Sequence, residues 1–197
     1  MKLTKLLERL DYKVVAGSDN IEITELVNDS RKVVPGSAFV CISGAVSDGH
    51  QYVKDVAERG AAAVIVEKDV EVPEGLTVIK VENTRYALAL MSAAYFGYPA
   101  EKLKTIGITG TKGKTTTTYM VKAILEEVGH KVGLIGTIEA IIGDKTIPSN
   151  NTTPESYTIQ KYFAQMVEAG CDCVVMEVSS QGLMLHRTAG IMFDIGI

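Results

Sequence analysis

A glycine-rich loop with two lysines is the stretch of this sequence with the clearest chemistry. Residues 108–118 read ITGTKGKTTTT and follow an apolar run, so the loop is expected between a buried strand and a helix. Such a turn aims backbone N–H groups and the positive end of the helix dipole at one point, which suits a phosphate. Lys114 can reach the phosphate oxygens, and the Thr115 hydroxyl stands where Mg²⁺ is usually held. The predicted nucleotide-binding residues are Gly110, Thr111, Lys112, Gly113, Lys114, Thr115 and Thr116.

The match of this loop to the P-loop pattern is incomplete. G-x-x-x-x-G-K-[ST] requires glycine at position 108, where the chain has Ile108, and the nearest glycines are Gly107 and Gly110. The strand expected before the loop, the helix expected after it and four consecutive threonines favour a phosphate site over a chance match. For Lys112, a direct phosphate contact and a solvated loop charge are equally open.

One carboxylate stands where the loop would need a metal ligand. Glu177 directly follows the buried run CVVM, at the expected carboxyl end of a strand, which is the edge where α/β sheets bind ligands. Phosphoryl transfer also requires cations that neutralise the charge on the transferred group. We therefore predict that Thr115 and Glu177 bind Mg²⁺ and that Lys114 and Glu177 are catalytic. A structural ion pair is the alternative for Glu177.

The cysteines and histidines do not have the spacing of a metal site. The nearest cysteine pair, CDC, has one residue between its members, where zinc ribbons have two to four. We expect Cys41, Cys171 and Cys173 to be buried as small hydrophobic residues on strands. The histidines are scattered, and His130, in EEVGHKV, is expected in a loop after a helix.

Helical and strand-like patterns alternate along the whole chain, which is typical of α/β layers. With 197 residues, of which 46% are hydrophobic, the chain can bury a core. The elements expected in the first part are strands within 37–42, 61–67 and 76–81, and helices within 3–10, 50–59 and 84–95. Thr84 is the expected N-cap of the last of these helices.

A domain boundary is expected in the segment FGYPAEKLK, residues 96–104, which combines Gly, Pro and charge after a helix. The predicted domains are residues 1–100 and 101–197. The elements expected in the second are strands within 104–109, 131–137 and 173–178, a hairpin within 138–148 with a Gly-Asp turn, and helices over 115–128 and after an N-cap at Thr153. The final FDIGI reads as a buried strand, so we expect this mostly parallel α/β domain to be incomplete.

Charge and hydropathy exclude some classes of function. A formal net charge of −4 argues against a surface that coats nucleic acid. No run of 18 apolar residues occurs, and the first residues, MKLTKLLERLDYK, predict an amphipathic helix rather than a secretory signal. A cytoplasmic protein without nucleic-acid or membrane partners is therefore expected.

Three motifs, GTKGKTTTT, NTTPES and MEVSSQGL, stand in an order and spacing that resemble the Mur ligases of peptidoglycan synthesis. NTTPES and EVSS are typical of the branch that forms the muramoyl tripeptide, the MurE type. Residues 28–67 resemble the domain of this family that holds the uridine nucleotide. The resemblance covers the whole chain, but the family's chains are more than twice as long.

This resemblance implies a small α/β domain for the UDP-linked substrate, followed by a truncated P-loop ATPase domain. It further implies a ligase that uses ATP and Mg²⁺ to phosphorylate the D-Glu carboxylate of UDP-MurNAc-L-Ala-D-Glu, and then joins it to meso-diaminopimelate or L-lysine through an acyl phosphate. A monomer is implied. The implied substrate contacts are Ser30, Asn151, Thr152, Thr153, Ser179 and Arg187, and the loop residues Ala45, Val46 and Ser47 are implied at the uracil.

Some family features are missing from these residues. Gln181 stands where His is frequent, and Leu185 where some members have a substrate-binding Gln. The family's carbamylated lysine and amino-acid-selecting domain would lie beyond Ile197, so we expect residues 1–197 alone to form no amide bond. Alternative interpretations are a non-catalytic nucleotide-sugar or ATP-binding module, a P-loop kinase and a folylpolyglutamate-type ligase.

Overall fold

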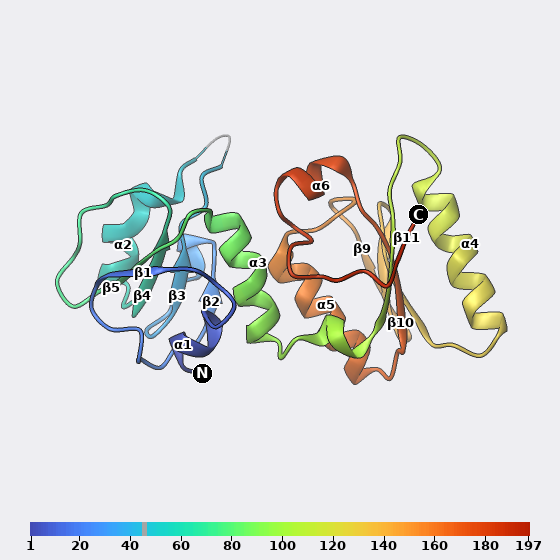
Figure 1. Ribbon diagram of the computed structural model, residues 1–197, viewed down its shortest axis with the longest axis horizontal. Coiled ribbons are helices and arrows are strands. Elements are labelled where there is room, and N and C mark those ends of the chain that lie inside the picture. The colour runs from blue at the N-terminus through green and yellow to red at the C-terminus, as the bar shows by residue number, and fades with distance from the viewer. Residues whose placement is uncertain (45–46) are drawn as a thin grey trace. The chain divides into compact units, whose positions relative to one another are not determined.

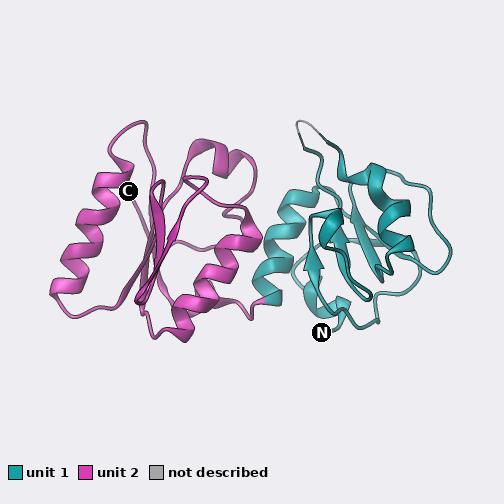
Figure 2. Ribbon diagram, turned by 180° about the vertical axis from the view of Figure 1, so that it is seen from behind, with its two compact units in different colours: residues 1–95 teal, residues 96–197 magenta. Residues whose placement is uncertain are grey.

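The computed structural model describes residues 1–44 and 47–197 and divides the chain into two units, residues 1–95 and 96–197 (Figure 2). The division falls at the start of the segment FGYPAEKLK. Both units are α/β, which confirms the expected fold class. No helix in the described part of the chain is long and apolar enough to cross a membrane.

The first unit is built on a five-stranded sheet in the order β1-β5-β4-β3-β2. Its strands are β1 (Lys13–Ala16), β2 (Leu26–Val27), β3 (Ala38–Val40), β4 (Ala63–Val66) and β5 (Thr77–Lys80). β2 to β5 are parallel, and β1 is antiparallel to β5. β3 and β4 are buried along their whole length, as is typical of parallel strands covered on both faces. β1 and β2 were not expected, because β1 is largely exposed and β2 has two residues.

Helices cover both faces of this sheet. They are α1 (Leu3–Leu6), α2 (Val53–Glu58) and α3 (Thr84–Tyr95), with 3₁₀ turns η1 (Ser30–Lys32) and η2 (Gly49–Tyr52). α2 lies on one side of the sheet and α3 on the other (Figure 1). Val53 and Val56 of α2 belong to a core cluster with Phe39 and Val64. α1 is shorter than the expected 3–10 and packs against α3.

Thr84 is not the N-cap of α3, so that prediction is wrong. The Asn83 side chain instead accepts a hydrogen bond from the Tyr86 N–H at 2.9 Å. The backbone N–H and the hydroxyl of Thr84 both donate to the Glu67 carboxylate at 2.8 Å. Thr84 is fully buried, and this tertiary contact replaces the local cap.

The second unit is built on a six-stranded sheet in the order β11-β6-β10-β7-β8-β9. Its strands are β6 (Lys104–Ile108), β7 (Val132–Ile135), β8 (Glu139–Ile142), β9 (Lys145–Pro148), β10 (Cys173–Glu177) and β11 (Ile195–Gly196). β11, β6, β10 and β7 are parallel, and β8 and β9 form the predicted hairpin across Gly143 and Asp144. The carboxyl ends of β6, β10 and β7 therefore meet at one edge of the sheet.

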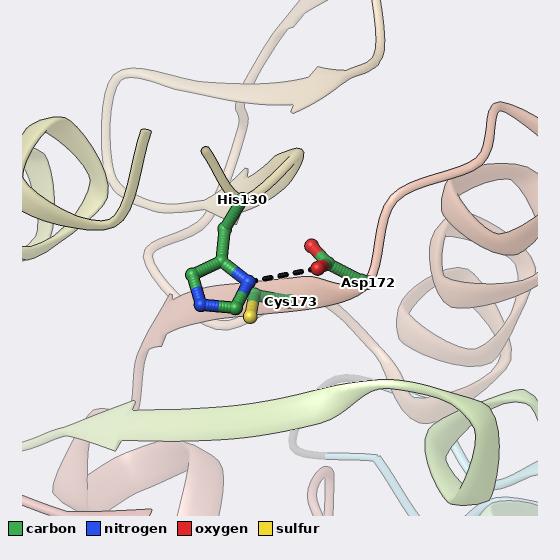
Figure 3. A group of neighbouring side chains, drawn as sticks. All are labelled: His130, Asp172 and Cys173. Atoms are coloured by element: carbon green, nitrogen blue, oxygen red, sulfur yellow. Dashed lines mark hydrogen bonds and ion pairs between the residues drawn. The ribbon is translucent and has the colours of Figure 1, made fainter. Parts of the chain in front are cut away.

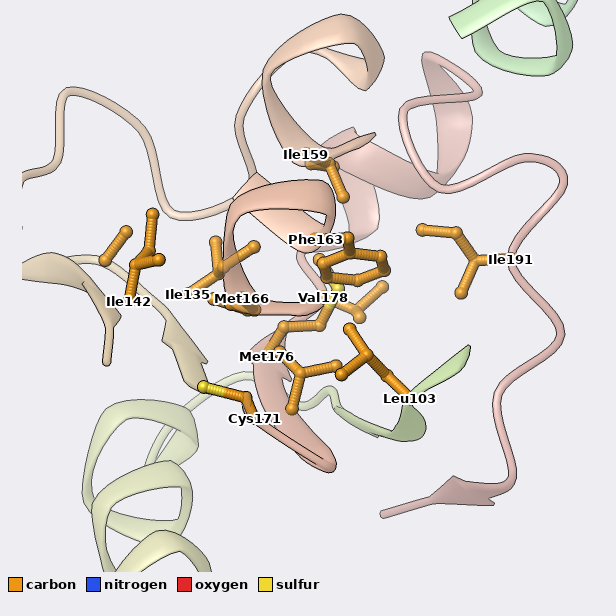
Figure 4. Close-up of a cluster of buried hydrophobic side chains, with 12 residues drawn as sticks. Leu103, Ile135, Ile142, Ile159, Phe163, Met166, Cys171, Met176, Val178 and Ile191 are labelled. Atoms are coloured by element: carbon orange, nitrogen blue, oxygen red, sulfur yellow. The ribbon is translucent and has the colours of Figure 1, made fainter. Parts of the chain in front are cut away.

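Two long helices enclose this sheet. The helices are α4 (Lys114–Glu127), α5 (Ser156–Glu168) and the short α6 (Ser180–Met184), with a 3₁₀ turn η3 (Pro99–Lys102). α4 and α5 lie on opposite faces (Figure 1). Under α5, Phe163 and Met166 pack with Met176 in the larger core cluster (Figure 4). On the other face, Val121 and Leu125 of α4 pack against a smaller cluster.

Two expectations for this unit are wrong. α5 begins at Ser156 with Glu155 in the cap position, because the Thr153 hydroxyl accepts from the backbone of Ser179 instead of capping the helix. The last strand, β11, is not buried, since Ile195 is 51% exposed. β11 pairs with β6 along one side, and no strand described here pairs with its other side.

Candidate nucleotide-binding site

The glycine-rich loop runs from the end of β6 to the start of α4, as expected. Gly110 and Gly113 have φ values of +133° and +80°, a region that disfavours side chains other than glycine. Gly113 occupies the N-cap position of α4 without a side-chain cap, so N–H groups of the first turn are left for an external acceptor. The Lys114 ammonium donates to the Gly110 carbonyl at 2.7 Å, which folds it across the loop. Lys112 is exposed.

Glu177 lies directly beside the start of α4. It is 1% exposed, although a carboxylate at the end of β10 carries a full charge when ionised. The Thr115 hydroxyl donates to Glu177 Oε2 at 3.1 Å, so the two predicted Mg²⁺ ligands are in contact. Within residues 1–44 and 47–197, no ion pair neutralises Glu177. A structural ion pair, the alternative considered for this residue, is therefore not what holds it.

Thr137 completes this cluster and was not anticipated. It follows β7, and its N–H and hydroxyl donate to the two oxygens of Glu177 at 2.8 and 3.1 Å. Gly136 before it permits the approach, because a Cβ there would lie 2.5 Å from Glu177 Oε1. The signal in the sequence was weak: Thr137 is the last residue of the strand pattern KVGLIGT and its only hydroxyl-bearing residue. Only the order of the strands shows that β7 neighbours β10.

Tyr119 of α4 adds a further polar group near Glu177. Its hydroxyl donates to the Glu139 carboxylate at 2.7 Å. Burial, the hydrogen bond to Glu139 and the nearby charges of Glu139 and Glu177 raise the pKa of Tyr119 to about 12. The phenol therefore remains protonated at neutral pH, and Tyr119 adds no negative charge next to Glu177.

Three of the implied substrate contacts form one connected group. The Thr153 hydroxyl lies 3.0 Å from the Glu177 carbonyl oxygen and accepts from the Ser179 N–H at 2.9 Å. The Ser179 hydroxyl caps α6 by accepting from the Gly182 N–H at 3.0 Å. Arg187 donates to the Thr153 carbonyl at 2.9 Å, which joins the segment after α6 to the segment before α5.

Arg187 is not a solvated charge. Its side chain is 12% exposed and forms an ion pair with Glu155. Its Nε is buried and has no hydrogen-bond partner among the described residues. A substrate role for Arg187 would therefore use a guanidinium that is already oriented by the fold.

Thr152 and Asn151 lie along the segment that leads to Thr153. The Thr152 and Thr137 hydroxyls are 3.0 Å apart, which links this segment to the Glu177 cluster. Asn151 is exposed, and its carbonyl accepts from the Ser149 hydroxyl at 2.7 Å. Asn151 therefore lies nearby, with its side chain unconstrained by these contacts.

Ser30, the implied contact to the uridine diphosphate, belongs to the first unit and opens η1 after β2. Asp29 caps this turn by accepting from the Arg31 N–H, and its carboxylate also binds the Arg31 guanidinium. These contacts hold the pKa of Asp29 at about 2, with the hydrogen bond from the Arg31 side chain as the largest cause. Ser30 is half-buried, and among the described residues its hydroxyl has no hydrogen-bond partner.

A polar network at the carboxyl edge of the first sheet was also missed. His50 Nδ1 lies 2.6 Å from Asp48 Oδ1, and His50 Nε2 accepts from the Glu67 N–H at 3.0 Å. The Ser43 hydroxyl donates to Glu67 at 2.7 Å, and Lys68 pairs with Asp48. These contacts hold Ser43 and Asp48 to the segment that follows β4. Ala45 and Val46, expected at the uracil, lie outside the described residues, while Ser47 contacts Gln51 and Tyr52.

Comparisons with known proteins match each unit separately. Residues 22–96 match the Mur ligase family, catalytic domain, and residues 108–197 match the Mur ligase middle domain. The chain belongs to the Mur ligase family. This Mur ligase chain is 49% identical over 197 residues to the UDP-N-acetylmuramoyl-L-alanyl-D-glutamate--2,6-diaminopimelate ligase of Clostridium perfringens, covering 100% of this chain and 41% of that protein. It is 47% identical over 196 residues to the ligase of the same name from Bacillus licheniformis, covering 99% and 40%.

Solved structures agree on the fold of this Mur ligase chain. A UDP-N-acetylmuramoyl-L-alanyl-D-glutamate--2,6-diaminopimelate ligase matches with a TM-score of 0.81 at 22% identity, over 100% of this chain and 39% of that one. MurF from Acinetobacter baumannii matches with a TM-score of 0.59 at 23% identity, over 91% and 36%. The chain thus spans about 41% of the length of the curated relatives it matches.

Proposed function

We propose that residues 1–197 are the nucleotide-binding part of an ATP-dependent ligase that adds an amino acid to the D-Glu of UDP-MurNAc-L-Ala-D-Glu. The observation that carries the proposal is the buried Glu177, which has no counter-cation among the described residues and contacts the first turn of the P-loop helix. The names of the relatives favour 2,6-diaminopimelate over L-lysine as the added amino acid. A cytoplasmic monomer accords with this substrate.

The residues around Glu177 fit a magnesium ion. Thr115, Thr137 and Glu177 offer oxygen ligands only, which is the donor set that Mg²⁺ takes. Thr115 and Glu177 would hold the ion. When bound, Mg²⁺ would neutralise charge on the phosphates of ATP.

The loop residues would bind and orient ATP. The free N–H groups at the start of α4 and the helix dipole favour the phosphates. Lys114 would exchange its hydrogen bond to Gly110 for the phosphate oxygens of ATP, where its positive charge stabilises the transferred group. The Gly110 and Gly113 backbones provide the close approach. Lys112 is exposed on the same loop and would be an additional contact to the phosphates.

The carboxylate substrate requires activation before an amine can attack it. A carboxylate is a poor electrophile, so the γ-phosphoryl group of ATP is transferred to the D-Glu carboxylate, and ADP leaves. The amino group then attacks the acyl phosphate, which forms the amide and releases phosphate. In the second unit, Asn151, Thr152, Thr153, Ser179 and Arg187 are proposed to bind the muramoyl peptide, and in the first unit Ser30 is proposed to bind the uridine diphosphate.

The uridine-linked substrate provides the test of this assignment. We expect isothermal titration of the 197-residue chain to show binding of UDP-MurNAc-L-Ala-D-Glu that Ser30→Ala weakens. Ser18→Ala is a matched control, because Ser18 contacts Thr77 at the start of β5 and therefore lies at the opposite edge of the first sheet. A folded chain that binds ATP but no uridine nucleotide would favour a P-loop kinase or a folylpolyglutamate-type ligase instead.

A further inference from the structure

Three side chains with metal-binding atoms meet at the end of the second sheet away from the P-loop. His130 follows α4, Asp172 precedes β10 and Cys173 is the first residue of β10. Their ligand atoms all lie within 4.8 Å of one another, and His130 Nδ1 lies 2.8 Å from Asp172 Oδ2 (Figure 3). In the figure, the imidazole, the carboxylate and the sulfur converge on one small space. The proposed ligase function uses none of them.

The backbone brings this group together from two places far apart in the sequence. β7 and β10 are parallel, with Cys173 opposite Val132. The Asp172 N–H donates to the Lys131 carbonyl, and the Lys131 N–H donates to Asp172 Oδ1, both at 3.0 Å. This pair of bonds fixes the carboxylate, so that Oδ2 faces His130. In protein metal sites, a carboxylate ligand is commonly oriented in this way, by a hydrogen bond to the oxygen that does not bind the metal.

We propose that His130, Asp172 and Cys173 form a binding site for a thiophilic divalent cation such as Zn²⁺. An imidazole nitrogen, a carboxylate oxygen and a thiolate are all ligands of Zn²⁺, whereas Mg²⁺ and Ca²⁺ take oxygen ligands. His130 and Asp172 are exposed and Cys173 is buried, so the cation would lie at the surface with at least one position open to water. The CDC spacing did not predict this site, because His130 lies 42 positions before Asp172, in the connection between α4 and β7.

Cation binding would replace a proton on sulfur. Burial, with the nearby charge of Asp172, raises the pKa of the Cys173 thiol, so the metal-free group is neutral. On binding, the S–H bond breaks, the proton leaves to solvent and a metal–sulfur bond forms. The hydrogen bond from His130 Nδ1–H to Asp172 is lost, the imidazole takes the tautomer with its proton on Nε2, and the freed Nδ1 and the Asp172 carboxylate each bind the cation. Lys104 lies beside Cys173 on β6, and its positive charge would repel the cation. This repulsion is reduced because Lys104 forms an ion pair with Asp194 at 3.5 Å.

This site is separate from the magnesium site proposed above. Cys173 and Glu177 are the two ends of β10, which places them about 13 Å apart at the usual rise of a strand. Binding at one can therefore be measured while the other is filled. Excess Mg²⁺ in the buffer occupies oxygen-ligand sites and leaves the thiolate site for the softer ion.

Cobalt is the probe for the first experiment, because Co²⁺ bound to thiolate has a sulfur-to-metal charge-transfer band in the near ultraviolet. The reduced 197-residue chain is titrated with Co²⁺ in buffer with excess Mg²⁺, and Zn²⁺ is then added to displace it. We expect one equivalent of Co²⁺ to give the band and one equivalent of Zn²⁺ to remove it. Cys171→Ser is the matched control: Cys171 is also buried, but belongs to the cluster under α5.

The variants give opposite results if the proposal is right. Cys173→Ser loses the charge-transfer band and Cys171→Ser keeps it. His130→Ala and Asp172→Asn, which change exposed side chains and preserve the core, each weaken Zn²⁺ binding by at least about tenfold. The proposal is overturned if the folded wild-type chain gives no band, if Cys171→Ser removes it, or if His130→Ala and Asp172→Asn bind Zn²⁺ as tightly as wild type.

Discussion

Glu177 connects stability and ligand binding at the scale of a single residue. A buried carboxylate without a cation is unfavourable, although Thr115 and Thr137 partly compensate it with hydrogen bonds. Glu177→Gln keeps the shape and removes the charge. In chelator, we expect its melting temperature to equal or exceed that of wild type. Its affinity for ATP with Mg²⁺ should fall by at least about tenfold.

The control for this prediction is Glu168→Gln, which neutralises an exposed carboxylate at the end of α5. It should change neither quantity. Differential scanning fluorimetry with and without Mg²⁺ and isothermal titration with ATP measure both. If Glu177→Gln melted well below wild type in chelator, Glu177 would be a structural group and not a site prepared for a cation.

Gly136 makes the contact between Thr137 and Glu177 possible. An alanine Cβ would lie 2.5 Å from Glu177 Oε1, so Gly136→Ala must displace either the carboxylate or β7. We expect a loss of about 1–3 kcal/mol in the free energy of unfolding. Gly196→Ala is the control, because its Cβ would meet no atom within 4 Å. Equal stability of the two variants in urea would refute the close approach.

Local pattern was sufficient for some of these residues and insufficient for others. Glu177 could be predicted because a charged residue directly after a buried apolar run is unusual, and because a phosphate-binding loop requires a further metal ligand. Thr137 could not, since a threonine after a strand is common. Its role depends on β7 lying next to β10, and strand order is a tertiary property that spacing along one strand does not contain.

Arg187 acts at the scale of elements, because it joins the segment after α6 to the segment before α5. Its guanidinium binds the Thr153 carbonyl and the Glu155 carboxylate and is largely shielded from solvent. Arg187→Ala should therefore lower the free energy of unfolding of the second unit by about 1.5–3 kcal/mol. Lys112→Ala, at an exposed loop lysine, should stay within about 0.5 kcal/mol of wild type in the same urea titration. An unchanged Arg187→Ala would mean that this tie is dispensable.

Asp48, the cap of η2 before α2, stabilises this part of the first unit through its bonds to His50 and Lys68. Hydrogen bonds from Lys68 and then His50 hold the pKa of Asp48 well below its usual range. The folded-state pKa is thus lower than the unfolded one, so this contribution is complete above about pH 4 and is lost as pH falls further. Asp48→Asn should be less stable than wild type at neutral pH and decline less steeply in acid.

Hydrogen exchange measured by mass spectrometry can follow this prediction in residues 1–95 separately from the second unit. Ser18→Ala is a suitable control, because Ser18 lies away from the loop and carries no charge. If the stability of Asp48→Asn and wild type fell equally as the pH is lowered, the contacts of Asp48 would not be retained in solution.

The helix caps at Thr84 and Thr153 were mispredicted because both hydroxyls bind groups distant in sequence.

At the scale of the whole molecule, the alternation of patterns was enough to predict two α/β parts and most strands. β1, β2 and the network around His50 were beyond that reasoning. The strands are short or exposed, and the network joins Ser43, Asp48 and His50 to residues 17 or more positions away. Burial of the final residues was also mispredicted, because an apolar run does not reveal whether a neighbouring strand is present to cover it.

The most direct test of the central claim is isothermal titration of the 197-residue chain with ATP and Mg²⁺, with Lys114→Met and Lys112→Met as paired variants. The two lysines share the loop, but Lys114 opens α4 and bonds to Gly110. We predict binding to wild type, a loss of at least about tenfold in Lys114→Met, and a smaller change in Lys112→Met. A folded wild-type chain that binds no ATP, or a Lys114→Met variant with wild-type affinity, would contradict the account.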